Sequence, residues 1–223
     1  MEFVKYPDRE LLMMDLATRL AGELRNALRG NDRATFCVPG GNTPGPVYDT
    51  ICGIDMDWSR ISVVLNDERW VPESSPRSNT RLLKARLLRD YAARATLVPL
   101  YREGMTPEEA APELSEDLAP HLPISVLLLG MGEDMHTASL IPGAEGLAEA
   151  MADRAPAVLP IRVAGEEEAR VTLSLPVLCD AMSTHVIITG ADKREALERA
   201  QKTAPDAAPI RPLLSNATVH WAE

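Results

Sequence analysis

His136 is the residue of this sequence best placed to move a proton. It follows the apolar run 126–129 and a glycine-rich bend, and the acids Glu133 and Asp134 lie within three positions of it. Histidine is the usual general base near neutral pH, and a buried aspartate beside it can fix which ring nitrogen carries the proton. We therefore predict that His136 activates a nucleophile and that Asp134 orients its ring. The other histidines have no clustered acids and are expected to have structural roles: His121, His185 and His220.

A second polar group, Asp67-Glu68-Arg69, follows the β-branched run 60–66. A guanidinium at that place can stabilise negative charge that develops on a substrate oxygen, and we assign this role to Arg69. The alternative is that Arg69 forms a simple ion pair with a nearby acid. If His136 is not the base, Asp67 and Asp134 are the next candidates, because a carboxylate can also accept a proton.

Two further segments suggest that the ligand carries a phosphate. Gly40-Gly41-Asn42-Thr43 follows the short apolar run 34–39. Glycines at a strand-to-helix turn let backbone N–H groups point inward, which suits a phosphate, although a tight turn with Thr43 as a helix cap explains the same pattern. Lys193, shortly after Gly190, can be a second phosphate ligand or an ordinary surface lysine.

Two patterns that resemble better-known sites fail on physical grounds. GNTPG, residues 41–45, has the outline of a nucleophile elbow, but Pro44 follows the threonine and has no N–H to donate to an oxyanion. GMGEDM, residues 130–135, starts like a dinucleotide fingerprint, but Met135 replaces the third glycine. No HExxH motif or Cys/His cluster offers a metal site. We therefore expect neither a nucleotide nor a metal.

These residues need a scaffold that brings distant segments together, and the hydrophobic pattern predicts one. Apolar or β-branched runs predict strands, and apolar residues at helical spacing with cap residues predict helices between them. The predicted strands are 34–39, 60–66, 95–100, 124–130, 184–190 and 217–222, with a hairpin at 157–163 and 169–175 around an acidic, solvated turn. The predicted helices are 8–29, 43–52, 80–91, 106–122, 176–182 and 192–202.

Strands that alternate with helices imply parallel βαβ units, and continuous apolar runs indicate strands covered on both faces. We predict a three-layer, Rossmann-like α/β fold, with a mostly parallel sheet and helices on both faces, in a single domain of residues 1–223. Ligands bind such sheets at the carboxyl ends of the strands, where the polar segments lie. Ser78 or Asn79 is expected to cap helix 80–91; the alternative is that the start of this helix also faces the site, with Asn79 as a substrate-binding residue.

The composition limits the partners and the compartment. The chain of 223 residues carries a net charge of −10 and no basic block, which argues against nucleic acid and anionic membranes. We expect no signal peptide, and no apolar run approaches the ~18 residues of a spanning helix. Three cysteines without a CxxC pair are expected to be free, buried thiols in the cytoplasm: Cys37, Cys52 and Cys179. A monomer and a small homo-oligomer are both compatible with the sequence.

Together these segments resemble the 6-phosphogluconolactonase family. The matching stretches run in order along nearly the whole chain: VPGGNTPGPVY (38–48), LNDERWVPESSPRSNTRLL (65–83), LLLGMGEDMHTASLIPG (127–143), RVTLSLPVL (170–178), ITGADKREAL (188–197) and the closing PIRPLLSNATVHWA. The resemblance implies the fold of glucosamine-6-phosphate deaminases. It also implies hydrolysis of 6-phosphogluconolactone to 6-phosphogluconate, the second step of the oxidative pentose phosphate pathway, without a cofactor.

The resemblance also implies residue roles. The family's base corresponds to His136, and its Asp-Glu-Arg segment corresponds to Asp67 to Arg69. Its phosphate loop corresponds to Gly40 to Thr43, and its Gly-x-x-Lys motif to Gly190 and Lys193. Arg170 matches a further arginine of the family, which we assign to the substrate phosphate. Two positions depart from the family pattern. Asn42 stands where serine is usual. Met135 stands where glycine is usual, which strains the backbone if that position needs a positive φ.

Two other functions remain open. An amino-sugar phosphate isomerase/deaminase shares the fold, but HTASLIPG (136–143) lacks the further acid that the deaminases carry after the histidine. A sugar-phosphate-binding regulator without catalytic activity is favoured only by Met135. We therefore expect the partner of the site to be a phosphorylated sugar lactone.

Overall fold

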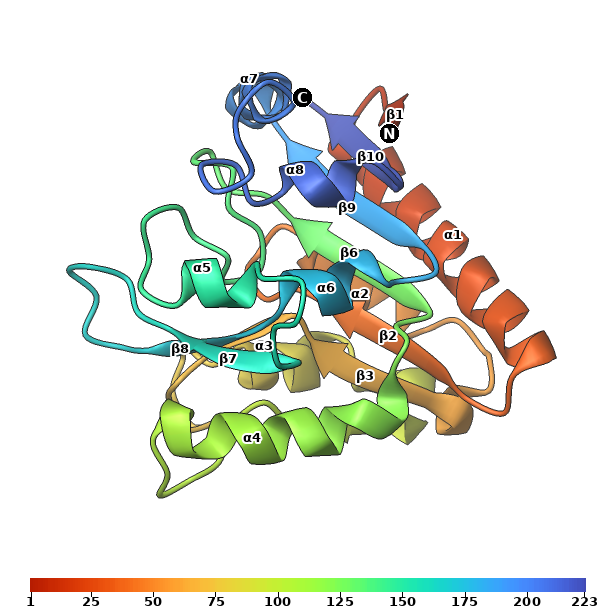
Figure 1. Cartoon of the computed structure of the whole chain (residues 1–223). Helices are drawn as coiled ribbons and strands as arrows, with labels where there is room; N and C mark the ends of the chain where they lie inside the picture. The colour runs from red at the N-terminus through yellow and green to blue at the C-terminus, as the bar shows by residue number, and fades with distance from the viewer.

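A seven-stranded parallel sheet forms the centre of the computed structural model, which describes residues 1–223 (Figure 1). The strand order is β1-β10-β9-β6-β2-β3-β5, and each neighbouring pair is parallel. The strands are β1 (Glu2–Lys5), β2 (Ala34–Val38), β3 (Ile61–Leu65), β5 (Thr96–Val98), β6 (Val126–Gly130), β9 (Thr184–Thr189) and β10 (Ala217–Ala222). The predicted mostly parallel sheet is confirmed.

The order of the strands fixes where a ligand can bind. From β2 the chain moves outward through β3 to β5, and it then returns to β6, on the other side of β2, and moves outward through β9 to β10. The carboxyl ends of β2 and β6 therefore flank a topological switch point, the usual binding position in open α/β sheets. Every residue of β2 and β3 is buried, as continuous apolar runs require of strands covered on both faces.

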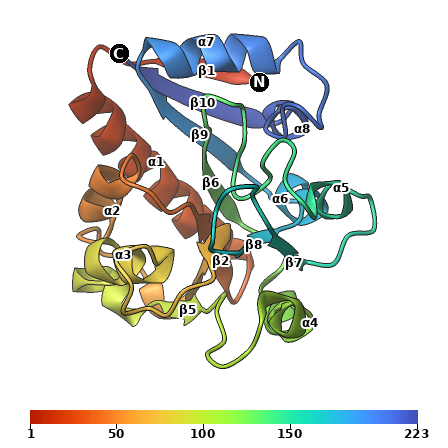
Figure 2. The ribbon, with the colours of Figure 1, turned by 90° about the vertical axis from the view of Figure 1, so that its left-hand side faces the viewer.

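Helices cover both faces of the sheet, which confirms the three layers (Figure 2). One side carries α1, α2 and α3, the other carries α4, α5, α6 and α8, and α7 lies along the upper end of the view. The helices are α1 (Arg9–Gly30), α2 (Gly45–Ile51), α3 (Asn79–Arg86), α4 (Pro107–Leu118), α5 (Leu147–Ala150), α6 (Leu175–Cys179), α7 (Ala191–Ala200) and α8 (Arg211–Leu214). None of them is long and apolar enough to cross a membrane.

The longest helix, α1, shows how the sequence pattern becomes packing. Asp8 caps it, with a side-chain oxygen that accepts a hydrogen bond from the N–H of Leu11. Its inner stripe is fully buried against the sheet, and each such leucine contributes roughly 1.5–3 kcal/mol: Leu12, Leu16, Leu20 and Leu24. These residues belong to one continuous cluster of 60 buried apolar residues.

A second sheet of three antiparallel strands begins one residue after β3 ends. It contains β4 (Asp67–Arg69), β8 (Arg170–Leu173) and β7 (Val158–Ile161), in the order β4-β8-β7. The predicted hairpin is therefore confirmed, whereas the strand β4 was not predicted. A polar tripeptide carries no strand signal of its own, and β4 exists because β8, about a hundred residues away, pairs with it.

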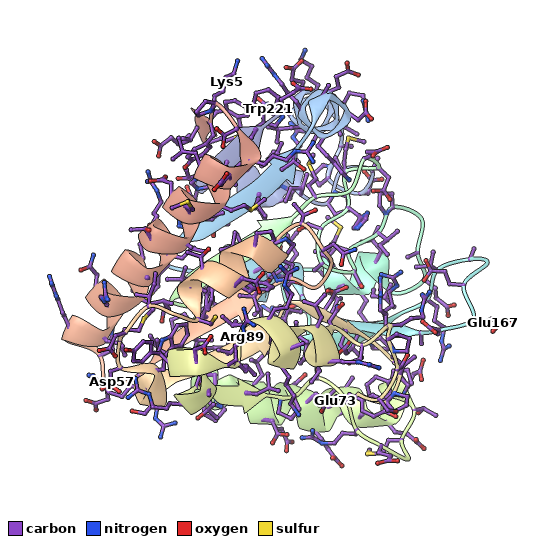
Figure 3. The ribbon with its side chains drawn as sticks, turned by 180° about the vertical axis from the view of Figure 1, so that it is seen from behind. Lys5, Asp57, Glu73, Arg89, Glu167 and Trp221 are labelled. Atoms are coloured by element: carbon purple, nitrogen blue, oxygen red, sulfur yellow. The ribbon has the colours of Figure 1, made fainter.

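The turn of this hairpin is only partly solvated. Figure 3 shows Glu167 at its tip, well away from the rest of the chain. Glu166 instead pairs with Arg170, and Glu168 pairs with Arg77.

Other predictions differ from the structure at element ends. The predicted helices 80–91 and 106–122 stop at Arg86 and Leu118 and are followed by short 3-10 turns. Thr43 is not a helix cap, because Pro44 holds the cap position and no side chain bonds to the first turn of α2. The strand β1 and the one-turn helices α5 and α8 were not predicted. The thiols of Cys37 and Cys52 are buried, but Cys179 is exposed.

Candidate active site

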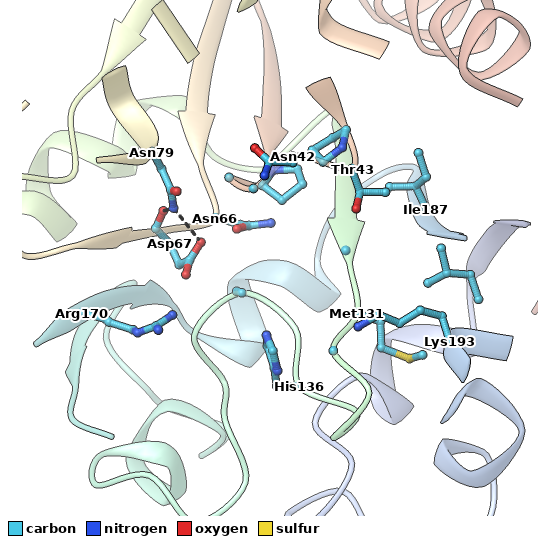
Figure 4. A pocket seen from close by; sticks show the side chains of 18 of the residues that line it. Asn42, Thr43, Asn66, Asp67, Asn79, Met131, His136, Arg170, Ile187 and Lys193 are labelled. Carbon is cyan, nitrogen blue, oxygen red and sulfur yellow. Dashed lines mark hydrogen bonds between the residues drawn. The ribbon is translucent and has the colours of Figure 1, made fainter. Parts of the chain in front are cut away.

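The predicted polar segments meet in one cavity of about 310 Å³ at the carboxyl ends of β2, β3, β6 and β9 (Figure 4). All of the predicted site residues except Asp134 line it: Gly40, Gly41, Asn42, Thr43, Asp67, Arg69, Asn79, His136, Arg170 and Lys193. The cavity therefore lies at the switch point of the sheet, where the rule for parallel sheets places it.

His136 is held by Asp134 through one ring nitrogen. Its Nδ1 lies 2.5 Å from Asp134 Oδ1. An ionised carboxylate can only accept hydrogen bonds, so Nδ1 carries the proton and Nε2 keeps a lone pair. Partial burial raises the pKa of Asp134, but the attraction and hydrogen bonds of His136 lower it more, and the net pKa lies below its usual value. Asp134 is thus an acceptor at neutral pH.

Asp134 is not buried, because its side chain is 53% exposed. It does not line the cavity. The predicted contact with His136 nevertheless forms, and it leaves Nε2 as the ring atom that is free to act.

The loop that carries His136 has an unusual backbone. Gly132 donates its N–H to the carbonyl of His136 at 2.9 Å, and a Cβ on Gly132 would lie 2.2 Å from both His136 Nδ1 and Asp134 Oδ1. Met135 has φ 68° and Ala138 has φ 50°, in the left-handed region that non-glycine residues rarely adopt. The position of Met135 does need a positive φ, and such strain clusters at functional sites.

The loop after β2 offers donors without protein acceptors. Gly41 has φ 82°, and none of the hydrogen bonds within the protein uses the backbone N–H of Gly41, Asn42 or Thr43. The loop is anchored beneath by the buried hydroxyl of Tyr48, which donates to the carbonyl of Pro39 at 2.6 Å. A run of free N–H groups in a turn is a site for an anion.

Lys193 reaches the cavity from the first turn of α7. Gly190, with φ 86°, begins this helix, and Lys193 is half-buried. No carboxylate forms an ion pair with Lys193. The ammonium group is therefore available to an anionic ligand.

The start of α3 contributes the side chain of Asn79 to the cavity, and its backbone N–H groups bind elsewhere in the protein. The buried carboxylate of Glu68 accepts from the N–H groups of Asn79 and Thr80 and from the hydroxyl of Ser78. The first N–H groups of α3 are therefore occupied within the protein and are not free to bind a ligand. The Asn79 side chain does line the cavity, and it donates to the carbonyl of Asp67 at 3.1 Å. Gly40 leaves room for it, since a Cβ there would lie 2.0 Å from Asn79 Oδ1.

Asp67 is fixed in place by its neighbours. Its Oδ2 accepts a hydrogen bond from Ser139 at 2.6 Å, and its Oδ1 lies 3.4 Å from the side-chain amide of Asn79. Both carboxylate oxygens of Asp67 have partners in the protein, whereas Nε2 of His136 has none. His136 is therefore the more available proton acceptor of the two.

The two arginines stand together, apart from Lys193. Arg69 and Arg170 are paired residues of β4 and β8. Arg69 donates to the carbonyl of Arg77 at 3.1 Å and forms no ion pair, whereas Arg170 makes a bidentate pair with Glu166. Figure 4 shows Arg170 and Lys193 on opposite sides of the cavity. Arg170 therefore lies across the cavity from Lys193.

Several lining residues were not predicted for the site. Asn66 had been included in the preceding strand, and Ile187 and Ile188 belong to β9. Met131 lies in the predicted bend but carries no polar group. The position of Asn66 directly after the last apolar residue of β3 is the one sequence signal that identifies it.

The parallel sheet, with a histidine–aspartate pair and an anion-binding loop at its switch point, defines an α/β enzyme for a small anionic ligand. The family model described as glucosamine-6-phosphate isomerases/6-phosphogluconolactonase matches residues 7–221, so the chain belongs to this family.

Individual proteins agree with this family. The chain is 40% identical to a 6-phosphogluconolactonase of Mesorhizobium japonicum over 97% of this chain and 93% of the other. The crystal structure of a 6-phosphogluconolactonase from Shewanella baltica superposes with a TM-score of 0.96 at 28% identity, covering 100% of this chain and 98% of that one. A monomeric glucosamine-6-phosphate deaminase has a TM-score of 0.82 at 15% identity over 100% and 98%, which shows the shared fold.

Proposed function

We propose that the protein hydrolyses 6-phospho-D-glucono-1,5-lactone to 6-phospho-D-gluconate, the second step of the oxidative pentose phosphate pathway. One observation carries the proposal: a single cavity holds a histidine with a free ring nitrogen on one side and an unpaired lysine with a loop of free N–H groups on another. Hydrolysis of a phosphorylated lactone needs both a base that activates water and a group that binds the phosphate. The relatives named 6-phosphogluconolactonase support the same reaction.

The base in this mechanism is Nε2 of His136. It takes a proton from a water molecule as the water oxygen attacks C1 of the lactone. Asp134 holds Nδ1–H and stabilises the imidazolium that forms. The C1–O5 bond of the tetrahedral intermediate then breaks, and His136 returns the proton to O5. One water is consumed, and the products are a carboxylate, a hydroxyl group and the proton that the new acid releases.

Arg69 stabilises the oxyanion that develops on the carbonyl oxygen. It lines the cavity and has no carboxylate partner, so its charge is not neutralised before the substrate binds. A preorganised donor of this kind is usually the largest single contribution to such a reaction. Arg170, paired with Glu166, lies beside it, and its predicted role as a phosphate ligand stays a prediction.

The phosphate does not react, and its binding orients the ring. The N–H groups of Gly41, Asn42 and Thr43 and the ammonium of Lys193 grip it, while the Asn79 side chain closes the wall near Gly40. Binding energy from a remote group of this kind lowers the barrier by holding C1 against the base.

The decisive assay supplies two substrates in parallel. Acid release from 6-phosphogluconolactone at constant pH should exceed the spontaneous rate, and glucosamine 6-phosphate should release no ammonia. Ammonia release without faster lactone loss would favour the deaminase reaction of the same family. A lactone rate equal to the background, with sugar phosphate still bound, would indicate a binding protein without catalytic activity.

A further inference from the structure

Asn66 lies between Asn42 and His136 in the view of the cavity in Figure 4. It lies between β3 and β4, and its own N–H donates to the carbonyl of Val38 at 2.9 Å, while its carbonyl accepts from Leu173 at 2.9 Å. The backbone is thus tied to β2 on one side and to the end of β8 on the other. The residue is fully buried by its neighbours and yet lines the cavity.

The orientation of the Asn66 amide follows from its one contact. Its Nδ2 lies 3.4 Å from the carbonyl oxygen of Leu128. Rotating the amide by half a turn would put two oxygens at that distance, so the nitrogen faces Leu128 and Oδ1 faces the other way. Oδ1 has no hydrogen-bond partner in the protein. Nine in ten or more of such buried groups are paired, so an orphan that lines a cavity marks a place for a ligand donor.

We propose that Asn66 is a specificity-determining residue, whose Oδ1 accepts a hydrogen bond from a ring hydroxyl of the substrate. The inference rests on the proposed function. Phosphate and C1 are assigned to the loop of Asn42 and to His136, and Figure 4 shows Asn66 between these two. The part of a phosphogluconolactone between its phosphate and its carbonyl presents only hydroxyl groups as donors.

This contact selects for a polyhydroxylated sugar over a deoxy analogue. A site built to hydrogen-bond a hydroxyl rejects the analogue that lacks it, because the buried protein group is then left unpaired. His136, Arg69 and Lys193 recognise only the carbonyl and the phosphate. Asn66 Oδ1 is the buried oxygen in the cavity without a protein partner, and it is therefore assigned to a hydroxyl of the ring.

The experiment compares 6-phosphogluconolactone with its 2-deoxy, 3-deoxy and 4-deoxy analogues. For the wild type, kcat/KM should fall about 10-fold for one of the three analogues, the size expected when a buried acceptor is left unpaired. Asn66→Leu should remove that difference while still distinguishing the other two analogues as the wild type does. Asn66→Ala carries the same prediction if thermal unfolding shows that the leucine variant does not fold.

A matched control is available in the protein. Ser174 Oγ is the other buried side-chain oxygen without a partner, but it does not line the cavity. Ser174→Ala should retain the wild-type preference among the analogues.

The proposal is overturned if the wild type does not distinguish the analogues, or if both Asn66 variants keep its preference. The proposed function is tested separately, by the wild-type rate on the full lactone. If that rate equals the background, binding of 6-phosphogluconate and its deoxy forms by calorimetry decides the role of Asn66, with the same 10-fold expectation for Kd.

Discussion

Two pairs of histidine and carboxylate in this protein look alike locally and differ in their surroundings. His136 Nδ1 lies 2.5 Å from Asp134, and His185 Nε2 lies 2.8 Å from Glu23. The His136 side chain is 35% exposed, whereas that of His185 is 2% exposed. His136 of the first pair lines the cavity, and the second pair lies between α1 and β9, where His185 is buried and Glu23 is half-buried.

The buried pair continues into a chain of hydrogen bonds. His185 Nδ1 lies 3.0 Å from His220 Nε2, and His220 Nδ1 lies 2.9 Å from the hydroxyl of Tyr6, which donates to Asp15. The expectation that no acids lie near these histidines is wrong, because both acids come from α1 and only folding brings them close. All four ring nitrogens here have partners, while the cavity histidine keeps one free.

The comparison teaches that a histidine–carboxylate contact alone does not identify a base. A base needs a ring nitrogen without a protein partner, and it needs access to substrate. Burial lowers the pKa of His220 to about 3, and the charges of His185 and Arg19 add to the effect. His220 is therefore neutral and fully bonded at physiological pH, which suits a structural role.

Replacing the cavity histidine should have the largest effect on catalysis. His136→Ala removes the base and should lower kcat about 10²–10⁴-fold, with little change in KM. The melting temperature should stay close to that of the wild type, because the side chain is partly exposed and outside the core. Acid release at constant pH, corrected for the spontaneous rate, measures both parameters. A wild-type kcat would show that the base lies elsewhere, with Asp67 or Asp134 next.

Replacing Gly132 should have the second-largest effect on kcat, and the reason is purely geometric. A Cβ on Gly132 would lie 2.2 Å from Asp134 Oδ1 and His136 Nδ1, so Gly132→Ala should push the pair out of position. A displacement of about 1 Å can cost about 10²-fold in rate, and we expect kcat to fall by that order although no ionisable group changes. Gly53→Ala tests the general cost of replacing a loop glycine away from the cavity, because Gly53 has no positive φ and a Cβ there would lie 3.6 Å from its nearest neighbour. Equal kcat values for the two variants would mean that the pair does not need this placement.

A smaller effect is expected at the phosphate end. Lys193→Ala should raise KM about 10-fold, which corresponds to one charge-assisted contact, and should lower kcat less than His136→Ala does. Steady-state kinetics on the lactone separate the two parameters. Lys202→Ala, on the exposed turn after α7, is the control for loss of a charge. If Lys193→Ala changed kcat alone, its assignment to a non-reacting phosphate would have to be abandoned.

The buried histidines should affect stability and leave activity unchanged. His220 has a folded pKa of about 3 and an unfolded value of about 6.5. As the pH falls below about 6.5, the unfolded chain binds a proton that the folded chain does not, so this residue costs up to about 1.4 kcal/mol of stability per pH unit. Glu23, whose pKa is lowered by hydrogen bonds from His185 and Ser183 despite its burial, acts in the same direction.

His220→Gln removes the proton-binding group and can still bond to Tyr6 and His185. The free energy of unfolding, measured in urea between pH 7.5 and 4.5, should therefore fall less steeply with acid than in the wild type. Its kcat/KM at pH 7.5 should stay within about twofold of the wild-type value, since no contact with the cavity changes. An unchanged pH slope, or a large loss of kcat/KM, would remove the distinction between the two histidine regions.

The sheet and the site segments could be predicted because local signals and global topology agree. Apolar runs identified β2, β3, β6, β9 and β10, and the rule for parallel strands then placed the polar segments that follow four of them at one edge. Thr106 and Glu109 form the capping box that begins α4, as its sequence indicates. In these cases each element is determined by its own residues.

What the sequence could not predict depends on partners far along the chain. β4 is a strand only because β8 pairs with it, and Glu68 occupies the N–H groups of α3 only in the folded protein. The exposure of Asp134 and the burial of His185 beside Glu23 likewise depend on tertiary contacts, which the local sequence does not determine. Asn66 ended an apolar run and was counted with it, although its orphan oxygen is visible only in three dimensions.

The most direct test of the account is a crystal structure with 6-phosphogluconate bound. We expect the phosphate to lie on the N–H groups of Gly41 to Thr43 and on Lys193, and the C1 carboxylate to lie against His136 Nε2 and Arg69. A hydroxyl between the two ends should donate to Asn66. A ligand bound the other way round, with its phosphate on the two arginines and C1 beside Lys193, would contradict the mechanism.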